Sequence, residues 1–170
     1  MTALILIDIE REWINEKSDY FIGSDLQNYI KNINSILDFS RESGYKIIFI
    51  RHIEKDSASS FIENDDSTEI LSGINLKKSD IVIDKYNISS FYKTELEKEL
   101  IDVKNVLVTG ILTNLCVRMF VEEAYDRKFG ITIVEDCCTT FSEKIHSYTI
   151  KDLQITRPEI NVTTLDNLIN

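Results

Sequence analysis

Short apolar segments recur along the chain, and most are followed by a longer segment in which apolar residues return every three or four positions. The short segments predict strands, because they are brief runs rich in Ile, Val and Leu. Their helical-period neighbours predict helices that bury one face. The expected strands span 3–7, 46–50, 81–83, 105–108, 131–134 and 160–163, and the expected helices span 24–44, 94–101, 116–130, 142–153 and 164–169.

The clearest helical pattern lies in residues 24–44. Its apolar stripe is flanked by Ser24, which can cap the first turn, and by Gly44, which can end the last one. The residues on the stripe are Leu26, Tyr29, Ile30, Ile33, Ile36 and Leu37.

Apolar strands that alternate with amphipathic helices favour an α/β domain with a parallel sheet covered by helices on both faces. A chain of 170 residues suits one such domain over 1–170. The alternation breaks over 52–79, a polar segment with only a weak helical pattern at 68–76. Segments of this length are usually functional, and we expect a lid or a subunit contact.

The charge pattern restricts the possible partners. The formal net charge is −10, and Lys and Arg are scattered among acidic residues, which disfavours nucleic acid and anionic membranes. The first residues carry neither a basic segment nor a long apolar run, so we expect a cytoplasmic protein. Cys116, Cys137 and Cys138 form no C-x-x-C pair, which disfavours a disulfide framework or a structural zinc site.

Ligands of such sheets bind outside the carboxyl ends of the strands. An acid, a lysine and a cysteine are predicted at this edge: Asp8, Lys85 and Cys116. The full set that follows the five leading strands is Asp8 and Glu10, Arg51 and His52, Asp84 and Lys85, Thr109, Gly110 and Cys116, and Glu135 and Asp136.

These three residue types support one chemistry. A thiol attacks a carbonyl as thiolate, and a helix N-terminus with a nearby ammonium would lower the pKa of Cys116. Asp8 would take the thiol proton and later give it to a leaving amine, while Lys85 would hold Asp8 ionised. Taken singly, the cysteine is more often a packed small residue, the aspartate a turn residue and the lysine a solvated one. Their joint placement favours the catalytic interpretation.

At this point the chain resembles the isochorismatase-like cysteine hydrolases, which include nicotinamidases and carbamoylsarcosine amidases. The segment DIEREW (8–13) resembles the family's D-x-Q-x-x-F, and DKYNISSFYKTEL (84–96) resembles K-x-x-x-S-A-F-x-x-T-x-L. The segment VTGILTNLCV (108–117) is similar to G-x-x-T-x-x-C-V, and EDCCTTFSEKIH (135–146) to the family's E-D-A stretch. The likeness is weakest over 52–67.

The resemblance implies a three-layer, doubly wound α/β/α domain with a six-stranded parallel sheet, and a homo-oligomer, dimer or tetramer. It implies a catalytic triad of Asp8, Lys85 and Cys116. It further implies a cis peptide bond between Ile111 and Leu112, with the backbone N–H groups of Leu112 and Cys116 forming an oxyanion hole.

Two departures from the family pattern matter. Glu10 stands where the family usually has Gln, so it either adds charge near the thiol, selects a cationic substrate group or simply points to solvent. The nicotinamidase metal site resembles D-x-H after the second strand, but here Ile50 stands at the acid position and His52 lacks a second His before His146. We therefore expect no metal and no cofactor, and we interpret His52 as a loop or pocket residue.

The leading hypothesis is cysteine-dependent hydrolysis of a small amide, carbamoyl or ureido compound through a thioester. Trp13, Tyr86 and Phe91 would wall the pocket together with Glu10 and His52, although each aromatic ring could equally serve core packing. The alternatives are vinyl ether hydrolysis of the isochorismatase type and a catalytically impaired member that only binds a metabolite. From another class, a signalling receiver domain would also place acids after the first and third strands, but would need a lysine where this chain has Glu135.

Overall fold

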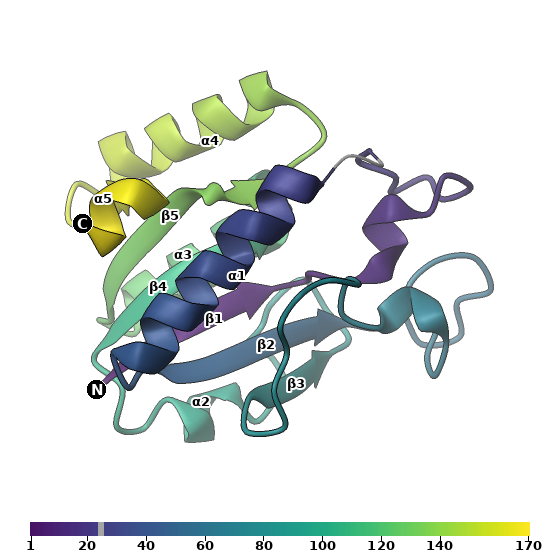
Figure 1. Ribbon diagram of the computed structural model, residues 1–170, viewed down its shortest axis with the longest axis horizontal. Helices are drawn as coiled ribbons and strands as arrows, with labels where there is room; N and C mark the ends of the chain where they lie inside the picture. The colour runs from purple at the N-terminus through teal and green to yellow at the C-terminus, as the bar shows by residue number, and fades with distance from the viewer. Residues whose placement is uncertain (24–25) are drawn as a thin grey trace.

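The computed structural model describes residues 1–23 and 26–170, which form a six-stranded parallel sheet in the order β3-β2-β1-β4-β5-β6 (Figure 1). Every neighbouring pair of strands is parallel, so the predicted sheet is confirmed. The strands are β1 (Thr2–Ile7), β2 (Lys46–His52), β3 (Ile81–Lys85), β4 (Asn105–Ile111), β5 (Gly130–Thr139) and β6 (Asn161–Thr163). Four of them, β2 to β5, run beyond their predicted carboxyl ends, which places His52 and Lys85 within strands.

The strand order also decides between two fold hypotheses. Receiver domains have the order 2-1-3-4-5, in which the third strand lies beside the first. Here β3 is an edge strand and β1 lies between β2 and β4. The receiver hypothesis is therefore wrong.

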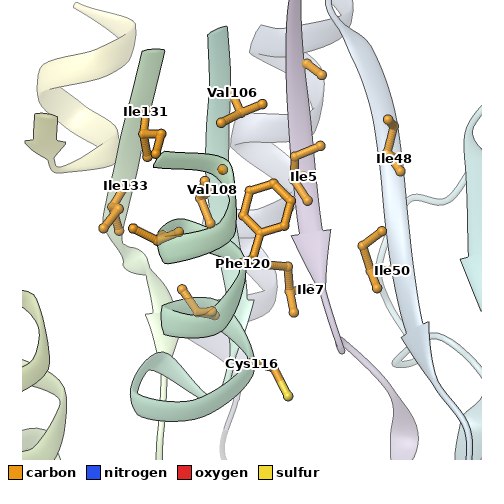
Figure 2. Packing of buried hydrophobic residues seen from close by; sticks show 14 of the residues in the cluster. Ile5, Ile7, Ile48, Ile50, Val106, Val108, Cys116, Phe120, Ile131 and Ile133 are labelled. Carbon is orange, nitrogen blue, oxygen red and sulfur yellow. The ribbon is translucent and has the colours of Figure 1, made fainter. Parts of the chain in front are cut away.

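Helices cover both faces of the sheet, as the doubly wound prediction requires (Figure 1). One face packs against α1 (Gln27–Glu42) and α5 (Leu165–Ile169), and the other against α2 (Leu96–Glu99), α3 (Arg118–Asp126) and α4 (Glu143–Thr156). Alternate residues of β1 serve the two cores: Leu4 and Leu6 face α1, whereas Ile5 and Ile7 face α3 (Figure 2). Within the described part of the chain, no helix is long and apolar enough to cross a membrane.

Helix α1 follows the stripe that the sequence predicts. Ile33, Ile36 and Leu37 are fully buried, and each such side chain contributes about 1.5 to 3 kcal/mol of burial free energy. The helix ends at Glu42, and Gly44 then adopts a φ of 69°. This left-handed conformation suits glycine and ends the helix. The predicted cap, Ser24, lies outside the described residues.

The segment between β2 and β3 contains one 3-10 turn, Asp66–Thr68, and the weak helical pattern at 68–76 does not form a helix. Residues that follow the turn pair with the chain that leaves β1. Glu69 O accepts from Arg11 N at 2.9 Å, and Leu71 N donates to Ile9 O at 2.9 Å. Because these backbone groups bond to another segment, they cannot form the local bonds of a helix. This pairing holds the segment at the carboxyl edge of the sheet, beside Asp8 and Glu10.

Strands β1 and β4 approach closely at Gly110. Its φ is 131°, and a Cβ atom at this position would lie 2.1 Å from the carbonyl oxygen of Ile7. Only glycine fits, because both the conformation and the space exclude a side chain.

We therefore expect Gly110→Ala to lower the free energy of unfolding by about 3 kcal/mol or more, since positive φ and backbone overlap both oppose the methyl group. Gly44→Ala is the matched control, because its φ is also positive but nothing lies within 4 Å of the added Cβ. It should cost only about 1 kcal/mol. Urea unfolding of the two variants checks this, and equal losses would contradict it.

Candidate active site

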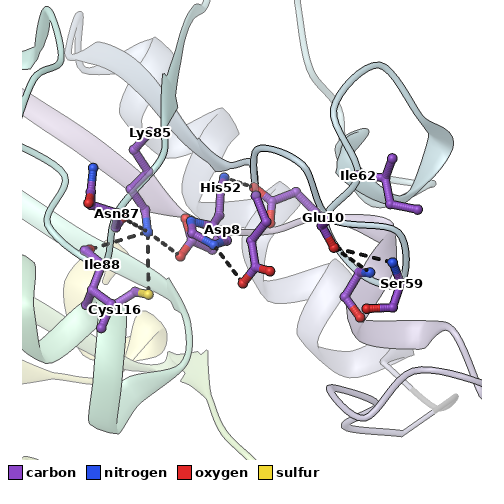
Figure 3. A network of polar contacts seen from close by, with 12 residues as sticks. Asp8, Glu10, His52, Ser59, Ile62, Lys85, Asn87, Ile88 and Cys116 are labelled. Carbon is purple, nitrogen blue, oxygen red and sulfur yellow. Dashed lines mark hydrogen bonds and ion pairs between the residues drawn. The ribbon is translucent and has the colours of Figure 1, made fainter.

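Three side chains from separate parts of the sequence meet at the carboxyl edge of the sheet. Asp8 follows β1, Lys85 ends β3, and Cys116 lies in a π-type turn, Thr113–Val117, between β4 and α3. Lys85 Nζ lies 2.9 Å from Asp8 Oδ2 and 3.5 Å from Cys116 Sγ (Figure 3). The structure thus brings the predicted acid, lysine and cysteine together.

Asp8 is held by its backbone. It has a φ of 52°, a left-handed conformation that few residues with a side chain adopt. Its N–H donates to Ile50 O at 2.9 Å, and its carbonyl oxygen accepts from Trp13 Nε1 at 2.6 Å. These bonds fix the chain on both sides of the Asp8 carboxyl group, which is 1% exposed.

Lys85 is fully buried, and backbone carbonyl groups supply much of its solvation. Its ammonium donates to Asn87 O at 3.2 Å and to Ile88 O at 3.3 Å, besides its contacts with Asp8 and Cys116. The turn that presents these carbonyls is closed by Ser89, whose hydroxyl donates to the carboxylate of Glu123.

Ser89 Oγ also accepts from the N–H groups of Phe91 and Tyr92, and Thr94 Oγ1 donates to Ser90 O at 2.6 Å. The spacing of Ser89, Phe91 and Thr94 in the sequence motif therefore has a structural explanation. These residues shape the turn beside the lysine.

The turn that carries Cys116 begins directly after β4. Leu112 O accepts from the N–H groups of Leu115 and Val117, each at 3.1 Å. The peptide bond between Ile111 and Leu112 is cis. Figure 2 shows Cys116 at the end of the core layer formed by Ile5, Ile7 and Phe120.

Two further hydrogen bonds tie this turn to the segment after β5. Thr113 Oγ1 lies 2.9 Å from His146 Nδ1, and Thr140 Oγ1 donates to Asn114 Oδ1 at 2.5 Å. The resemblance between 135–146 and the family's E-D-A stretch thus falls on residues that support the cysteine turn from the side of α4.

Burial dominates the electrostatics of the site. It raises the pKa of Asp8, and the nearby Lys85 ammonium lowers that pKa only in part. Burial lowers the pKa of Lys85, but Asp8 and Cys116 outweigh it and raise the pKa above its ordinary value. Burial and the charge of Asp8 raise the pKa of Cys116, and Lys85 opposes them.

The expected low pKa of Cys116 is therefore wrong. The helix N-terminus and the ammonium favour thiolate, but removing the sulfur from water costs the thiolate more. The resting site holds a neutral thiol beside a charged lysine and a carboxyl group. For this sulfur to attack a carbonyl, a base would have to take its proton, and Asp8 is adjacent.

Glu10 does not point to solvent, because it is fully buried. Its Oε1 accepts a hydrogen bond from the N–H of His52, and its Oε2 has no hydrogen-bond partner among the described residues. Burial, and secondly the charge of Asp8, raise the pKa of Glu10 well above its ordinary value.

His52 and Trp13 both lie beside this buried acid cluster. The His52 ring packs edge-on against Phe61 at 5.1 Å, and burial together with Lys85 lowers the pKa of His52 to about 4, so the ring is neutral at pH 7. Trp13 is 3% exposed and packs edge-on against Tyr20 and Phe61.

The other two predicted pocket residues, Tyr86 and Phe91, differ in their exposure. Tyr86 is 40% exposed, and Lys55 Nζ lies 4.2 Å from its ring centre. Phe91 is buried in the core, stacked on Phe120 at 5.5 Å and covered by the Arg127 guanidinium at 4.0 Å. The contacts of Phe91 are those of a core residue.

An open hollow of about 740 Å³ adjoins the buried cluster. Its wall includes His52, whose backbone N–H donates a hydrogen bond to Glu10. It also includes Asn87 and Ile88, whose carbonyl oxygens accept hydrogen bonds from Lys85. It is lined by His52, Glu54, Lys55, Tyr86, Asn87, Ile88, Ser89 and Tyr92.

The residues near His52 do not fit a metal centre of the D-x-H kind. Ile50 is fully buried in the core, and His52 Nε2 lies 3.6 Å from Glu54 Oε1. Across residues 1–23 and 26–170, no three His, Cys, Asp or Glu side chains are arranged to hold a metal ion together.

Some contributors to the site give no sequence signal. Asn87 and Ile88 act through backbone carbonyls, which any residue carries. Ile70 forms an antiparallel bridge with Glu10, and Phe61 packs against His52, although both lie in the segment that looks least ordered in sequence. Only their tertiary positions reveal them.

The raised pKa of Glu10 predicts how stability depends on pH. The folded protein keeps this proton at pH values where the unfolded chain releases it, so stability declines as pH rises from about 4.5 through the folded pKa. Glu10→Gln removes this titration and keeps an acceptor for the His52 N–H. We expect it to gain stability over wild type by about 1 kcal/mol or more at neutral pH, and less near pH 4. Thermal unfolding across this range checks it, with the exposed Glu16→Gln as control. A gap that stays constant with pH would contradict it.

Comparisons with known proteins agree with this arrangement. The isochorismatase domain family matches residues 2–166. Nicotinamidase 3 of Arabidopsis thaliana is 26% identical over 168 residues, covering 90% of this chain and 80% of that protein.

Among solved structures, a pyrazinamidase/nicotinamidase of Streptococcus mutans superposes with a TM-score of 0.85 at 20% identity, covering 95% of this chain and 99% of that one. The N-carbamoylsarcosine amidase of Thermoplasma acidophilum gives 0.83 at 20% identity, covering 97% and 96%. The match to nearly the whole chain, on a fold shared with these structures, shows that the protein belongs to the isochorismatase family.

Proposed function

We propose that the protein hydrolyses a small amide, carbamoyl or ureido compound through a thioester on Cys116. The observation that carries the proposal is the position of the Lys85 ammonium, within 2.9 Å of the Asp8 carboxylate and 3.5 Å of the Cys116 sulfur. Relatives named as a nicotinamidase and an N-carbamoylsarcosine amidase support hydrolysis of small C–N bonds.

The first half-reaction forms the thioester. Sγ of Cys116 attacks the carbonyl carbon while Asp8 takes the thiol proton, so the thiolate exists only as the new bond forms. The backbone N–H groups of Leu112 and Cys116 stabilise the oxyanion. The intermediate then collapses, the C–N bond breaks, and Asp8 gives the proton to the leaving amine.

The second half-reaction restores the enzyme. Asp8, again a carboxylate, takes a proton from a water molecule while the oxygen of that water attacks the thioester carbonyl carbon. The C–S bond breaks, the carboxylic or carbamic acid leaves, and the thiol is protonated again. Lys85 keeps Asp8 oriented and compensates the charge that moves between carboxylate, sulfur and oxyanion.

The cysteine has a direct test. Cys116→Ala should lower kcat on any amide substrate by about 10⁴-fold or more, because no nucleophile remains. Cys138→Ala is the matched control, since Cys138 is also 7% exposed and packs in the same core cluster. Mass spectrometry of quenched wild type should show an acyl group on Cys116. If Cys116→Ala still turns over isochorismate, the result would instead support vinyl ether hydrolysis. If the wild type binds an amide and does not hydrolyse it, the result would support a catalytically impaired member.

The pH dependence follows from Asp8. Its carboxyl must be ionised to act as base, and burial raises its pKa above the ordinary value of 3.8. The activity should therefore fall with decreasing pH in a limb centred above that value, and Asp8→Asn should remove turnover across the whole range. A kcat/KM profile measures this, and an acid limb at or below the ordinary value would contradict it.

We also propose that the protein is a cytoplasmic homo-oligomer. Its three cysteines are free in the described chain, which suits a reducing compartment. Helix α4 buries Ile150 and Leu153, yet its outer face exposes Ile145, Tyr148 and Ile155 by 41 to 69%. A second copy covering this face would account for them. Ile155→Glu should shift the mass measured by light scattering to that of a smaller species, whereas Ile101→Glu, on another exposed surface, should not.

A further inference from the structure

Glu10 is a buried acid that the proposed mechanism leaves without a role, and it lies beside the proposed triad. It is fully buried, and its Oε2 has no hydrogen-bond partner within residues 1–23 and 26–170. His52, which donates its backbone N–H to Glu10 Oε1, also has an unpartnered ring atom, Nδ1. Buried polar atoms without partners are unfavourable, and they are frequent where a ligand completes the bonding.

Glu10 also has no cation of its own. The positive charges of Lys85 and Arg51 lower the pKa of Glu10, and the negative charge of Asp8 raises it. Lys85 is bound to Asp8, to Cys116 and to two carbonyl groups. Arg51 forms a two-pronged ion pair with Asp84, at 2.7 and 2.9 Å. Both cations are thus committed elsewhere, so the Glu10 carboxyl group has no cationic partner that would stabilise its ionised form.

The neutral ring of His52 suits the same ligand. Its Nε2 lies 3.6 Å from Glu54 Oε1, which favours the proton on Nε2 and leaves the Nδ1 lone pair as an acceptor. When Glu10 is ionised, its Oε2 and His52 Nδ1 are two acceptors for which the described residues offer no donor. His52 also lines the open hollow, and its backbone N–H bonds to Glu10, so one residue links the wall of the hollow to the buried carboxyl group.

We propose that Glu10, assisted by His52, determines specificity by binding a cationic nitrogen group of the substrate, an ammonium or guanidinium, while Cys116 attacks the amide carbonyl. This inference rests on the proposed function, because it names the substrate class for the same site. Glu10 touches the substrate away from the reacting bond. It therefore affects which amides bind, and it leaves the proton transfers to Asp8.

The experiment compares two amides that differ in one group. 4-Aminobutanamide carries an ammonium where pentanamide, of the same length, carries a methyl. Wild type should prefer the cationic amide by at least tenfold in kcat/KM, and Glu10→Gln should remove that preference. Glu63→Gln is the matched control, because it removes an exposed carboxylate that bonds to Tyr86 at the hollow. It should keep the preference, and Glu10→Asp, which retains the charge, should keep part of it.

A binding measurement separates this inference from the hydrolase proposal. Calorimetry on Cys116→Ala, in two buffers of different ionisation enthalpy, should show that 4-aminobutanamide binds and releases a proton, because the raised pKa of Glu10 keeps it protonated until the cation arrives. The double variant with Glu10→Gln should bind more weakly and release none.

Each outcome has one meaning. Selective binding without wild-type turnover would leave the Glu10 inference standing and remove the hydrolase proposal. Turnover of both amides at equal efficiency, with no effect of Glu10→Gln on the ratio of their kcat/KM values, would support the hydrolase proposal and remove the Glu10 inference. If Cys116→Ala binds neither 4-aminobutanamide nor 4-guanidinobutanamide at millimolar concentration, the Glu10 inference is wrong.

Discussion

The contact of a fully buried lysine with an aspartate and a cysteine is the constraint on which the rest of the site depends. A charged ammonium inside a protein is stable only when anions and hydrogen-bond acceptors surround it. Lys85 obtains one carboxylate, one sulfur and two carbonyl oxygens. The carboxylate follows β1, the sulfur follows β4, and both carbonyls lie in the turn after β3, so loss of any one of these segments' contacts would leave a buried charge poorly compensated.

This constraint explains why the surrounding turns are so closely specified. Asp8 adopts a left-handed backbone, Gly110 allows β4 to approach β1, and Ser89 closes the turn that directs two carbonyls at the ammonium. The same burial that makes Lys85 dependent on its partners also keeps the Cys116 thiol protonated. In the proposed mechanism, proton transfer to Asp8 therefore accompanies the attack of the sulfur, and no resting thiolate is required.

Much of the site could be predicted from the sequence, because parallel strands end at one edge and residues that follow them meet there. Asp8, Lys85 and Cys116 were found in this way. The pKa of Cys116 was predicted in the wrong direction, because sequence reveals a nearby helix and lysine but not the degree of burial. The weak helical pattern at 68–76 forms no helix, since the pairing of 69–71 with 9–11 joins segments about sixty residues apart and is invisible to local periodicity.

The sequence by itself determined the α/β fold class, the six strands and the residue types at the sheet edge. Local periodicity and strand-end position carry that information, because both depend on neighbouring residues. The tertiary structure alone decided the state of Glu10. Whether that carboxyl met solvent or the core depended on its bridge to Ile70 and its bond to His52. Both are long-range contacts, and their burial sets the charge and the bonding that the residue can offer.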